Sequence, residues 1–298
     1  MIKNFNDFAN YKYQVSNEDI FSDNLELGIS GIKYDSKTLL VLPRNKNLGP
    51  INQYRELEFI EFNNYDLNDT EVKILNENEE VLEKVKYLSF WNTKLFDLTL
   101  LNIFKNVEFL SISHITDPDF TFNGIRDLSQ LKTLCLLKTG KVKDLTSLNF
   151  NDSIENLSII QPTNIKDTIG IGKLNNLKYL NIEGSYDKTY ELEKLNELDK
   201  LPSLEKIELT RINIPQKELI TALNLPFQIE LKIDTNLYST QEYKELSLEL
   251  KNVNSNAFTP YIESNDYVQP IGKGKRRIKK SDKKFEEKLD QLIEDWYK

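Results

Sequence analysis

The sequence contains few of the residues on which active sites most often depend. Among its 298 residues there is one cysteine, Cys135, and one histidine, His114. A single cysteine excludes a disulfide within the chain, and these counts exclude metal sites built from several cysteine or histidine ligands. Cys135 and His114 therefore form the only Cys-His pair available for nucleophilic catalysis.

Long apolar runs and an excess of positive charge are also missing. The stretch Met1–Phe8 has no uninterrupted apolar run of the roughly 7–15 residues found in secretory signal peptides, and no other run approaches the length of a membrane span. The formal net charge is −8. This charge disfavours a general binder of nucleic acid or anionic membrane, because both require a basic surface. We therefore expect a cytoplasmic protein with no membrane partner.

The dominant feature of the sequence is a phrase, apolar-x-x-apolar-x-apolar, that returns between residues 57 and 233. In one copy it consists of Ile154, Leu157 and Ile159. Successive copies begin 28, 22, 24, 23, 23, 27 and 24 residues apart, at Leu57, Val85, Val107, Leu131, Ile154, Leu177, Leu204 and Gln228. The last copy is the least regular, because its first residue is Gln228. Chance would not place seven apolar triplets and this eighth copy at such regular intervals.

This pattern resembles the leucine-rich-repeat family, whose repeats of about 20–29 residues carry an L-x-x-L-x-L core. The resemblance covers about three-fifths of the chain. It implies an α/β fold, a leucine-rich-repeat solenoid with about eight parallel strands on the concave face and helices and loops on the convex face. Bacterial proteins that look like this include internalin-like adhesins and cytoplasmic repeat proteins, and the missing signal peptide favours the second kind.

The segments outside the repeats are interpreted as caps and a tail. Two β-prone runs predict a hairpin-like N-terminal cap in residues 1–50, ahead of the repeats at 51–235. Residues 236–252 predict a C-terminal cap helix, 253–284 a linker with a basic run, and 285–298 an amphipathic helix. Within the repeats, helical patterns predict the returning segments Asp69–Leu82, Leu98–Phe104, Tyr190–Leu198 and Gln216–Leu223.

Two patterns that superficially suggest chemistry fail on spacing. His114 lies three residues further along its strand than Cys135 does along the next, which puts the two backbones roughly 11 Å apart. A dyad needs about 3 Å between heavy atoms, so we interpret His114 as an exposed polar residue and Cys135 as a half-exposed one. The stretch Gly170–Lys173 lacks the flanking glycine and hydroxyl residue of a phosphate loop and is better explained as a tight turn. We expect no catalytic residue, cofactor or metal.

The concave face is more informative, because alternation along each strand predicts which side chains point away from the core. Large apolar groups gather on these outward rows in the first six repeats, whereas the last two repeats carry charges there. Isolated exposed apolar residues are common, but a contiguous patch containing Trp and Tyr indicates a binding site. The predicted site has bulky walls, Phe59, Tyr87, Trp91, Phe109, Leu137, Ile160 and Tyr179, and a floor of small residues, Ser89, Ser111, Cys135 and Ser158.

Two functions are consistent with these patterns. The leading hypothesis is a non-enzymatic protein–protein interaction module that binds a protein or peptide on the concave face, as the family resemblance implies. The alternative is a nucleic-acid or ribonucleoprotein adaptor that uses the basic run 273–284, which is otherwise interpreted as a solvated linker. The final helix is expected to bury Leu289, Ile293 and Trp296 against the solenoid or a partner, because an isolated helix of about 14 residues is marginal in water.

Overall fold

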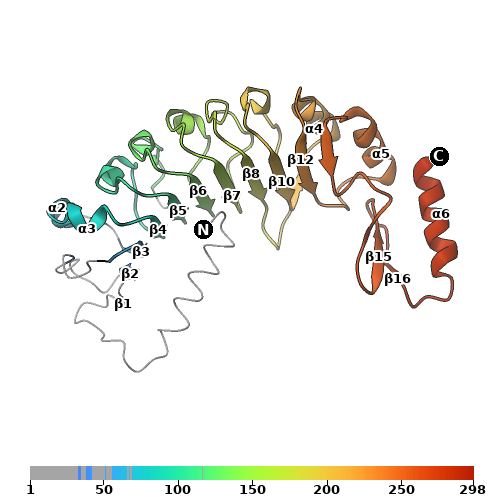
Figure 1. Ribbon diagram of the computed structural model, residues 1–298, viewed down its shortest axis with the longest axis horizontal. Helices are drawn as coiled ribbons and strands as arrows, with labels where there is room; N and C mark the ends of the chain where they lie inside the picture. Colours follow the sequence, from blue (N-terminus) through green and yellow to red (C-terminus); the bar gives the residue numbers. More distant parts are fainter. Residues whose placement is uncertain are drawn as a thin grey trace.

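The chain forms a curved arch, with strands on its inner, concave side and helices and loops on its outer, convex side (Figure 1). The computed structural model describes residues 33–34, 38–41, 51, 56–65, 67, 69–115 and 117–298, with the backbone alone at 33–34, 38–41 and 149–150. Nearly all of the predicted N-terminal cap lies outside these residues. The solenoid predicted from the repeat is confirmed.

One sheet of eleven strands runs the length of the arch, in the order β1-β2-β3-β4-β5-β6-β7-β8-β10-β12-β13. All neighbours from β2 (Thr38–Val41) to β13 (Val253–Ser255) are parallel, and β1 (Lys33–Tyr34) is antiparallel to β2. Each of the eight phrases supplies one strand, as predicted: β3 (Phe59–Asn63), β4 (Tyr87–Trp91), β5 (Phe109–Ser113), β6 (Thr133–Leu137), β7 (Asn156–Ile160), β8 (Tyr179–Glu183), β10 (Lys206–Thr210) and β12 (Ile229–Ile233).

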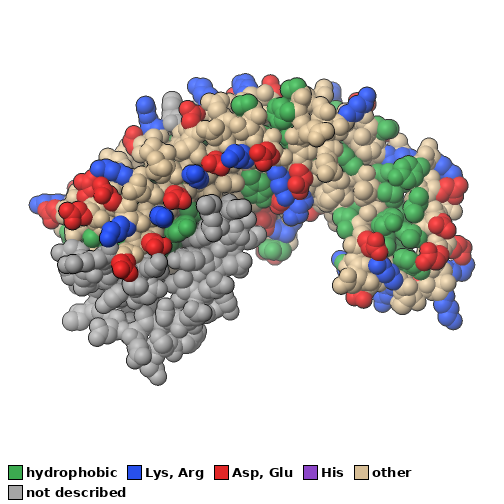
Figure 2. Space-filling model, viewed as in Figure 1, with side chains coloured by type: hydrophobic (Ala, Val, Ile, Leu, Met, Phe, Trp, Pro, Cys, Tyr) green, Lys and Arg blue, Asp and Glu red, His purple; other side chains and the backbone are tan. Residues whose placement is uncertain are grey.

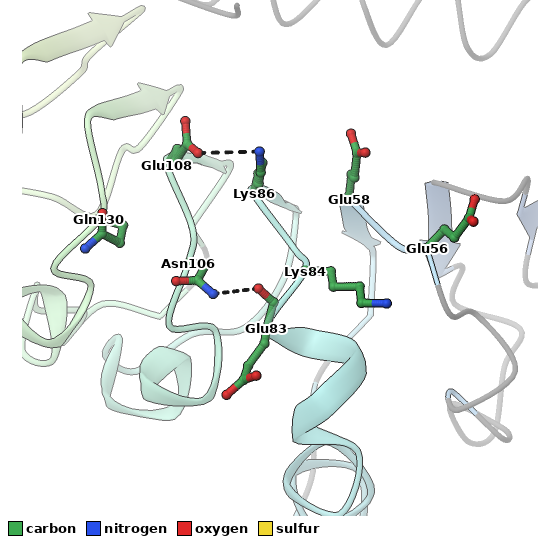
Figure 3. Close-up of a pocket in the computed structure, with 8 residues that line it drawn as sticks. All are labelled: Glu56, Glu58, Glu83, Lys84, Lys86, Asn106, Glu108 and Gln130. Carbon is green, nitrogen blue, oxygen red and sulfur yellow. Dashed lines mark hydrogen bonds and ion pairs between the residues drawn. The ribbon is translucent and has the colours of Figure 1, made fainter.

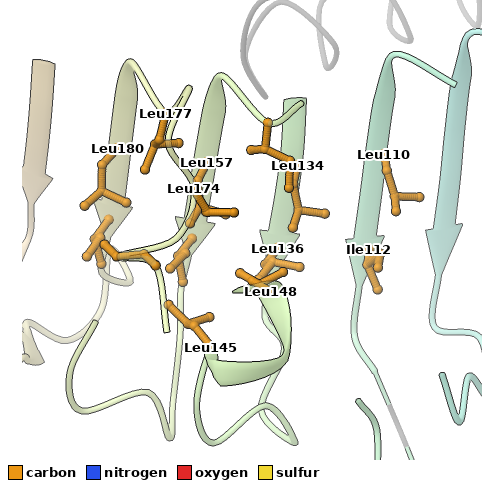
Figure 4. Packing of buried hydrophobic residues seen from close by; sticks show 14 of the residues in the cluster. Leu110, Ile112, Leu134, Leu136, Leu145, Leu148, Leu157, Leu174, Leu177 and Leu180 are labelled. Atoms are coloured by element: carbon orange, nitrogen blue, oxygen red, sulfur yellow. The ribbon is translucent and has the colours of Figure 1, made fainter. Parts of the chain in front are cut away.

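The phrase leucines form the core because the strands pair without any shift in register. Leu134 lies beside Leu157, and Leu157 lies beside Leu180, on three successive strands. All three side chains are fully buried. They face the returning segments, from which Leu145, Leu148 and Leu174 complete the same layers (Figure 4). The predicted column of stacked leucines is confirmed.

The returning segments on the convex side differ in how regular they are. The first contains α2 (Asp69–Asn76) and α3 (Glu79–Leu82), and the last is α4 (Gln216–Leu223), as predicted. The next three contain short 3-10 turns, η2 (Thr99–Ile103), η3 (Ile125–Asp127) and η4 (Thr146–Phe150), and the return between β7 and β8 contains no helical turn.

The helix predicted over Tyr190–Leu198 is wrong. The segment begins with β9 (Tyr190–Glu191), which pairs with β11 (Ile212–Asn213), and a 3-10 turn, η5 (Leu198–Lys200), starts only at its end. Leu192, Leu195 and Leu198 are nevertheless buried. A spacing of three residues between buried leucines is therefore compatible with an extended segment as well as with a helix.

Backbone hydrogen bonds form a ladder at the ends of the parallel strands. The residue that follows each of β3, β4, β5, β6, β7 and β10 has a positive φ between 50° and 56°. After β3 to β7 this amide donates to the last carbonyl of the next strand, as from His114 to Leu137 at 3.0 Å and from Lys138 to Ile160 at 2.8 Å. After β10, the amide of Arg211 donates instead to the carboxylate of Asp234, at 2.6 Å. Each strand is thereby tied to its neighbour where the chain turns away from the sheet.

The C-terminal region is more ordered than the sequence indicated. A cap helix is present as α5 (Thr240–Glu249), but 253–284 is not an irregular linker. Its first residues form β13, and β14 (Tyr261–Glu263), β15 (Tyr267–Pro270) and β16 (Ile278–Lys279) form a separate antiparallel sheet. Because backbone pairing does not require apolar side chains, the Asn-, Ser- and Pro-rich composition concealed these strands.

The last helix, α6 (Phe285–Tyr297), docks on the rest of the chain through its apolar stripe. Trp296 is only 6% exposed and belongs to the main core, whereas Leu289 and Ile293 are half-buried. Apolar side chains gather along this helix in Figure 2. Among the described residues, no helix is both long enough and apolar enough to cross a membrane.

Replacing Trp296 with alanine is therefore expected to lower the free energy of unfolding by about 3 kcal/mol, since the indole leaves a cavity in the core. The adjacent Tyr297 is 77% exposed, so Tyr297→Ala is a matched control with little expected effect. Urea unfolding followed by circular dichroism measures both. Equal stabilities for the two variants would show that α6 is not docked.

Candidate functional site

The structure brings seven of the predicted site residues into one apolar cluster on the concave side of the sheet. This cluster is separate from the core between the strands and the convex segments. It arises because the outward-facing residues of successive strands lie side by side. These are the third and fifth residues of each phrase and the residue directly after the phrase. Tyr87, for example, lies beside Phe109. We call it the concave cluster; it consists of Phe59, Phe109, Cys135, Leu137 and Ile160, with Tyr87 and Trp91 packed against them.

Most of the concave cluster is buried, which the sequence did not predict. Phe109 is 1% exposed, and every residue of β5 and β6 is buried, including those that point away from the core. On β8 and β10, by contrast, buried and half-buried residues alternate as expected for a sheet with one open face. The expectation that the concave side chains of β3 to β7 form an open surface is therefore wrong for most of them. The half-buried exceptions are Asn63, Tyr87, Trp91 and Asn156.

The small residues predicted as the floor lie in one row across four strands. Ser89 is beside Ser111, Ser111 is beside Cys135, and Cys135 is beside Ser158. All four are at most 3% exposed. Burial, and to a lesser extent the negative charge of Glu183, raises the pKa of the Cys135 thiol far above its ordinary value. A thiol in this setting is inert, and the interpretation of Cys135 as half-exposed is wrong.

His114 belongs to the edge of this surface. Its backbone is left-handed, and its ring packs against that of Trp91 at an angle of 45°, with a distance of 4.5 Å between ring centroids. Burial, followed by the nearby charge of Lys138, lowers the pKa of His114. The imidazole is therefore neutral at pH 7 and packs as a flat, weakly polar group beside the indole.

Neither of the two chemical patterns considered in the sequence forms a reactive site. The raised thiol pKa of Cys135 leaves no nucleophile for a Cys-His pair. At Gly170 and Gly172 the backbone amides donate to the Glu197 carboxylate, at 2.7 and 3.2 Å, so a side chain of the protein occupies the place that a phosphate would take. In the part of the chain that the structure describes, no group of three or more His, Cys, Asp or Glu residues is arranged to hold a metal.

The C-terminal part of the concave face is polar and self-paired. Glu208 lies between Lys206 and Lys232, with nitrogen–oxygen distances of 3.0 and 3.2 Å, and Lys206 also reaches Glu230 at 2.9 Å. Burial opposes ionisation of Glu208, but its two lysines outweigh it and lower the pKa of the carboxyl. Tyr179, the eleventh predicted site residue, lies beside this network, half-buried and outside the concave cluster.

A charged ladder that the sequence analysis missed runs along the edge of the sheet where the strands begin. The second position of successive phrases alternates in charge, and the pairs Lys86–Glu108, Lys132–Glu155 and Lys178–Glu155 lie at 3.9, 3.7 and 2.8 Å. The signal in the sequence is the alternation itself: Glu58, Lys86, Glu108, Lys132, Glu155, Lys178 and Glu205. Exposed pairs of this kind add little stability, but each favours the correct register of neighbouring strands.

The same ladder lines a depression of about 540 Å³ near the N-terminal end of the arch (Figure 3). Lys86 there faces Glu108, and Asn106 donates to the backbone carbonyl of Glu83 at 2.7 Å. Two pairs of its lining residues are thus engaged with each other, and we assign the depression to the scaffold and not to a ligand site.

The basic run of the tail is also partly engaged. Lys280 pairs with Glu263 at 2.6 Å, and the guanidinium of Arg277 lies 4.5 Å from the centre of the Tyr267 ring. These contacts tie the run to the β14–β16 sheet. It therefore serves at least partly as internal structure and not as a free cationic stripe.

No family model matches the sequence, and no curated protein matches it. Among solved structures, human 5T4 (trophoblast glycoprotein) is similar with a TM-score of 0.50 and 12% identity, covering 75% of this chain and 87% of that one. Internalin C2 from Listeria monocytogenes is similar with a TM-score of 0.42 and 16% identity, covering 68% of this chain and 85% of that one. These are leucine-rich-repeat proteins, and identities of this size show the fold alone.

Proposed function

We propose that this chain, a leucine-rich-repeat solenoid, is a non-enzymatic protein-interaction module that binds a protein or peptide segment on its concave cluster. The observation that carries the proposal is the second apolar cluster itself. The strands already bury their phrase residues on the other face, so the solenoid does not need Phe59, Tyr87 or Trp91 for its own core. An apolar cluster outside the core that leaves a Tyr and a Trp half-exposed, as Tyr87 and Trp91 are, is characteristic of protein interfaces.

The contrast within the sheet supports this placement. On β10 and β12 the same outward positions hold Lys206, Glu208 and Lys232, which pair with one another. Apolar residues are therefore not a general requirement of this face. In this proposal the concave cluster supplies the affinity for the partner, and the charged side chains of β10 and β12 orient the partner. Charge pairs at the rim of an interface steer association more than they strengthen it.

Capture and salt titration test the proposed function. The immobilised chain, exposed to nuclease-treated lysate of its source cells, is expected to retain a protein whose dissociation constant changes less than about tenfold between 50 and 200 mM salt. An adaptor acting through the basic run would lose roughly 10³- to 10⁵-fold in affinity over that range if it contacted 6–10 phosphates. Retention that disappears after nuclease treatment would contradict the proposal.

A matched variant separates the two surfaces. Replacing Lys275, Arg276 and Lys283, three exposed bases of the tail, with glutamine is expected to leave capture unchanged. A loss of the captured protein in this variant would assign binding to the tail and not to the concave cluster.

A further inference from the structure

A second depression, of about 420 Å³, lies at the edge of the sheet where the parallel strands β6, β7 and β8 end, in the middle part of the arch (Figure 1). Three lysines line it, and each comes from a different repeat. Lys138 directly follows β6, Lys166 lies in the return after β7, and Lys188 lies in the loop after β8. We call this depression the lysine pocket.

The charges of these three lysines are not used in internal ion pairs. All three side chains are exposed, and in the part of the chain that the structure describes no ion pair includes any of them. The lysines at the other edge of the sheet and on β12 differ, because Lys132, Lys178 and Lys232 lie 3.7, 2.8 and 3.2 Å from carboxylates. The lysine pocket therefore gathers cations that the scaffold leaves available.

The carboxylate that lines the lysine pocket is bound to another group. Glu191 accepts hydrogen bonds from the side-chain amide of Asn213, at 2.9 and 2.7 Å. Lys166 reaches only the backbone carbonyl of Glu191, at 3.5 Å, and lies 5.3 Å from the centre of the Tyr190 ring. Three lysines against one glutamate leave the lining with a formal charge of +2. Hydroxyl groups add neutral donors, from Thr163, Ser185 and Thr189.

An exposed aromatic ring stands at the margin of the lysine pocket, in the same loop as Lys188. Tyr186 is 80% exposed, and the guanidinium of Arg211 lies 4.0 Å from the centre of its ring. Arg211 is itself held by the carboxylate of Glu183 and by the carbonyl of Gly184, to which its Nε donates at 3.2 Å. A ring fixed in this way loses little conformational freedom on binding, and Tyr and Arg are favoured residues of protein interfaces.

The lysine pocket adjoins the concave cluster. Lys138 directly follows Leu137, and Gln161, which also lines the pocket, directly follows Ile160. Leu137 and Ile160 belong to the concave cluster. A bound polypeptide can therefore contact the cluster and the pocket at the same time.

We propose that the lysine pocket binds an acidic segment of a protein, with two carboxylates or one phosphate group placed among its three lysines. Two carboxylates, or one phosphate of about −1.5 to −2, match the formal charge of the lining. A nucleic acid fits less well, because the chain has a net charge of −8 and the three lysines form a pocket and not a stripe. That the acidic segment belongs to the protein bound on the concave cluster rests on the proposed function.

Fluorescence anisotropy with dye-labelled peptides tests the lysine pocket in the full chain. Three peptides of equal length differ only at two central positions, which hold two glutamates, a phosphoserine with a glutamine, or two glutamines. At about 50 mM salt, at least one anionic peptide is expected to bind with a dissociation constant below ~1 mM, and the neutral peptide at least ~10-fold more weakly. The ratio of the two anionic affinities distinguishes carboxylate from phosphate. Failure of both anionic peptides to bind, or equal binding of all three, would overturn the proposal.

Matched variants assign the binding to the lysine pocket. Lys138→Gln with Lys166→Gln and Lys188→Gln is expected to weaken the anionic peptides at least ~10-fold and to leave the circular dichroism unchanged, because the three side chains are exposed. The tail variant, in which Lys275, Arg276 and Lys283 are glutamine, loses the same charge and is expected to bind as the natural chain does. Equal losses in the two variants would overturn the proposal. So would an oligothymidylate that binds the pocket more tightly than the peptides.

The peptides require no natural partner, so the two proposals fail separately. Peptide binding that the pocket variant loses, together with partner binding that Trp91→Ala leaves unchanged, would contradict the proposed function alone. Absence of peptide binding, together with partner binding that depends on Trp91, would contradict the lysine pocket alone.

Discussion

Replacing Gly170 with alanine is expected to lower the free energy of unfolding by about 3–5 kcal/mol, the largest stability effect of any single substitution proposed for this chain. Gly170 has a φ of +109°, a region that residues with a Cβ rarely adopt. An added Cβ would lie 2.3 Å from the carbonyl carbon of Leu145 and 2.4 Å from the amide nitrogen of Thr146, both in the preceding return. Because these are backbone atoms, relief requires the return itself to move.

Gly274 provides the matched control. Its φ is also positive, at +76°, but an added Cβ would meet nothing within 4 Å. Gly274→Ala therefore has only the conformational cost, about 1 kcal/mol. Equilibrium unfolding in urea compares the two variants. Equal free energies of unfolding for the two variants would contradict the expectation that the return at Gly170 packs too closely against the preceding return to admit a Cβ.

The eight strands could be predicted from the sequence because local pattern and final environment agree in each of them. In Leu131–Leu136, for example, apolar residues recur at the positions that the core fills, and the strand follows as Thr133–Leu137. Equal spacing of the phrases then sets which residues become neighbours, so the members of the concave cluster could be predicted as well.

The elements that were wrong depend on partners distant in sequence. Tyr190 begins a strand because Ile212 pairs with it and because its hydroxyl donates to the carbonyl of Ile165. Tyr261–Glu263 is a strand because Tyr267–Pro270 folds back on it. Neither interaction leaves a periodic signal in the segment itself. Helical spacing therefore predicted a helix at the first segment, and loop-like composition predicted a linker at the second.

The burial of the concave cluster illustrates a different limit. Alternation tells which side of the sheet Phe109 and Cys135 occupy, but it carries no information about what lies on that side. The members of the concave cluster are thus neighbours, as the spacing of the phrases predicted, but most of them are buried. Whether a partner uses this set is a proposal that binding measurements decide.

The second large effect expected is on partner affinity. Tyr87 and Trp91 are the half-buried members of the concave cluster, so they are the ones that an incoming protein meets first. Truncating a central aromatic anchor commonly costs about 2–4 kcal/mol of binding free energy. Trp91→Ala and Tyr87→Ala are therefore each expected to weaken partner binding by roughly 30- to 1000-fold. The fold should persist, because both side chains lie outside the main core.

Phe96 supplies the control for loss of an exposed aromatic. It is 62% exposed and lies in the loop after β4, outside the concave cluster. Phe96→Ala is expected to bind the partner as the natural chain does. A loss of binding in this variant equal to that in Trp91→Ala would indicate a general effect of surface truncation.

Isothermal titration of the captured partner into the natural chain, Trp91→Ala and Phe96→Ala tests the placement of the binding site most directly. Recognition on the concave cluster predicts a dissociation constant raised at least ~30-fold in Trp91→Ala and unchanged in Phe96→Ala. Equal dissociation constants for all three chains, with each variant shown to be folded by circular dichroism, would contradict it.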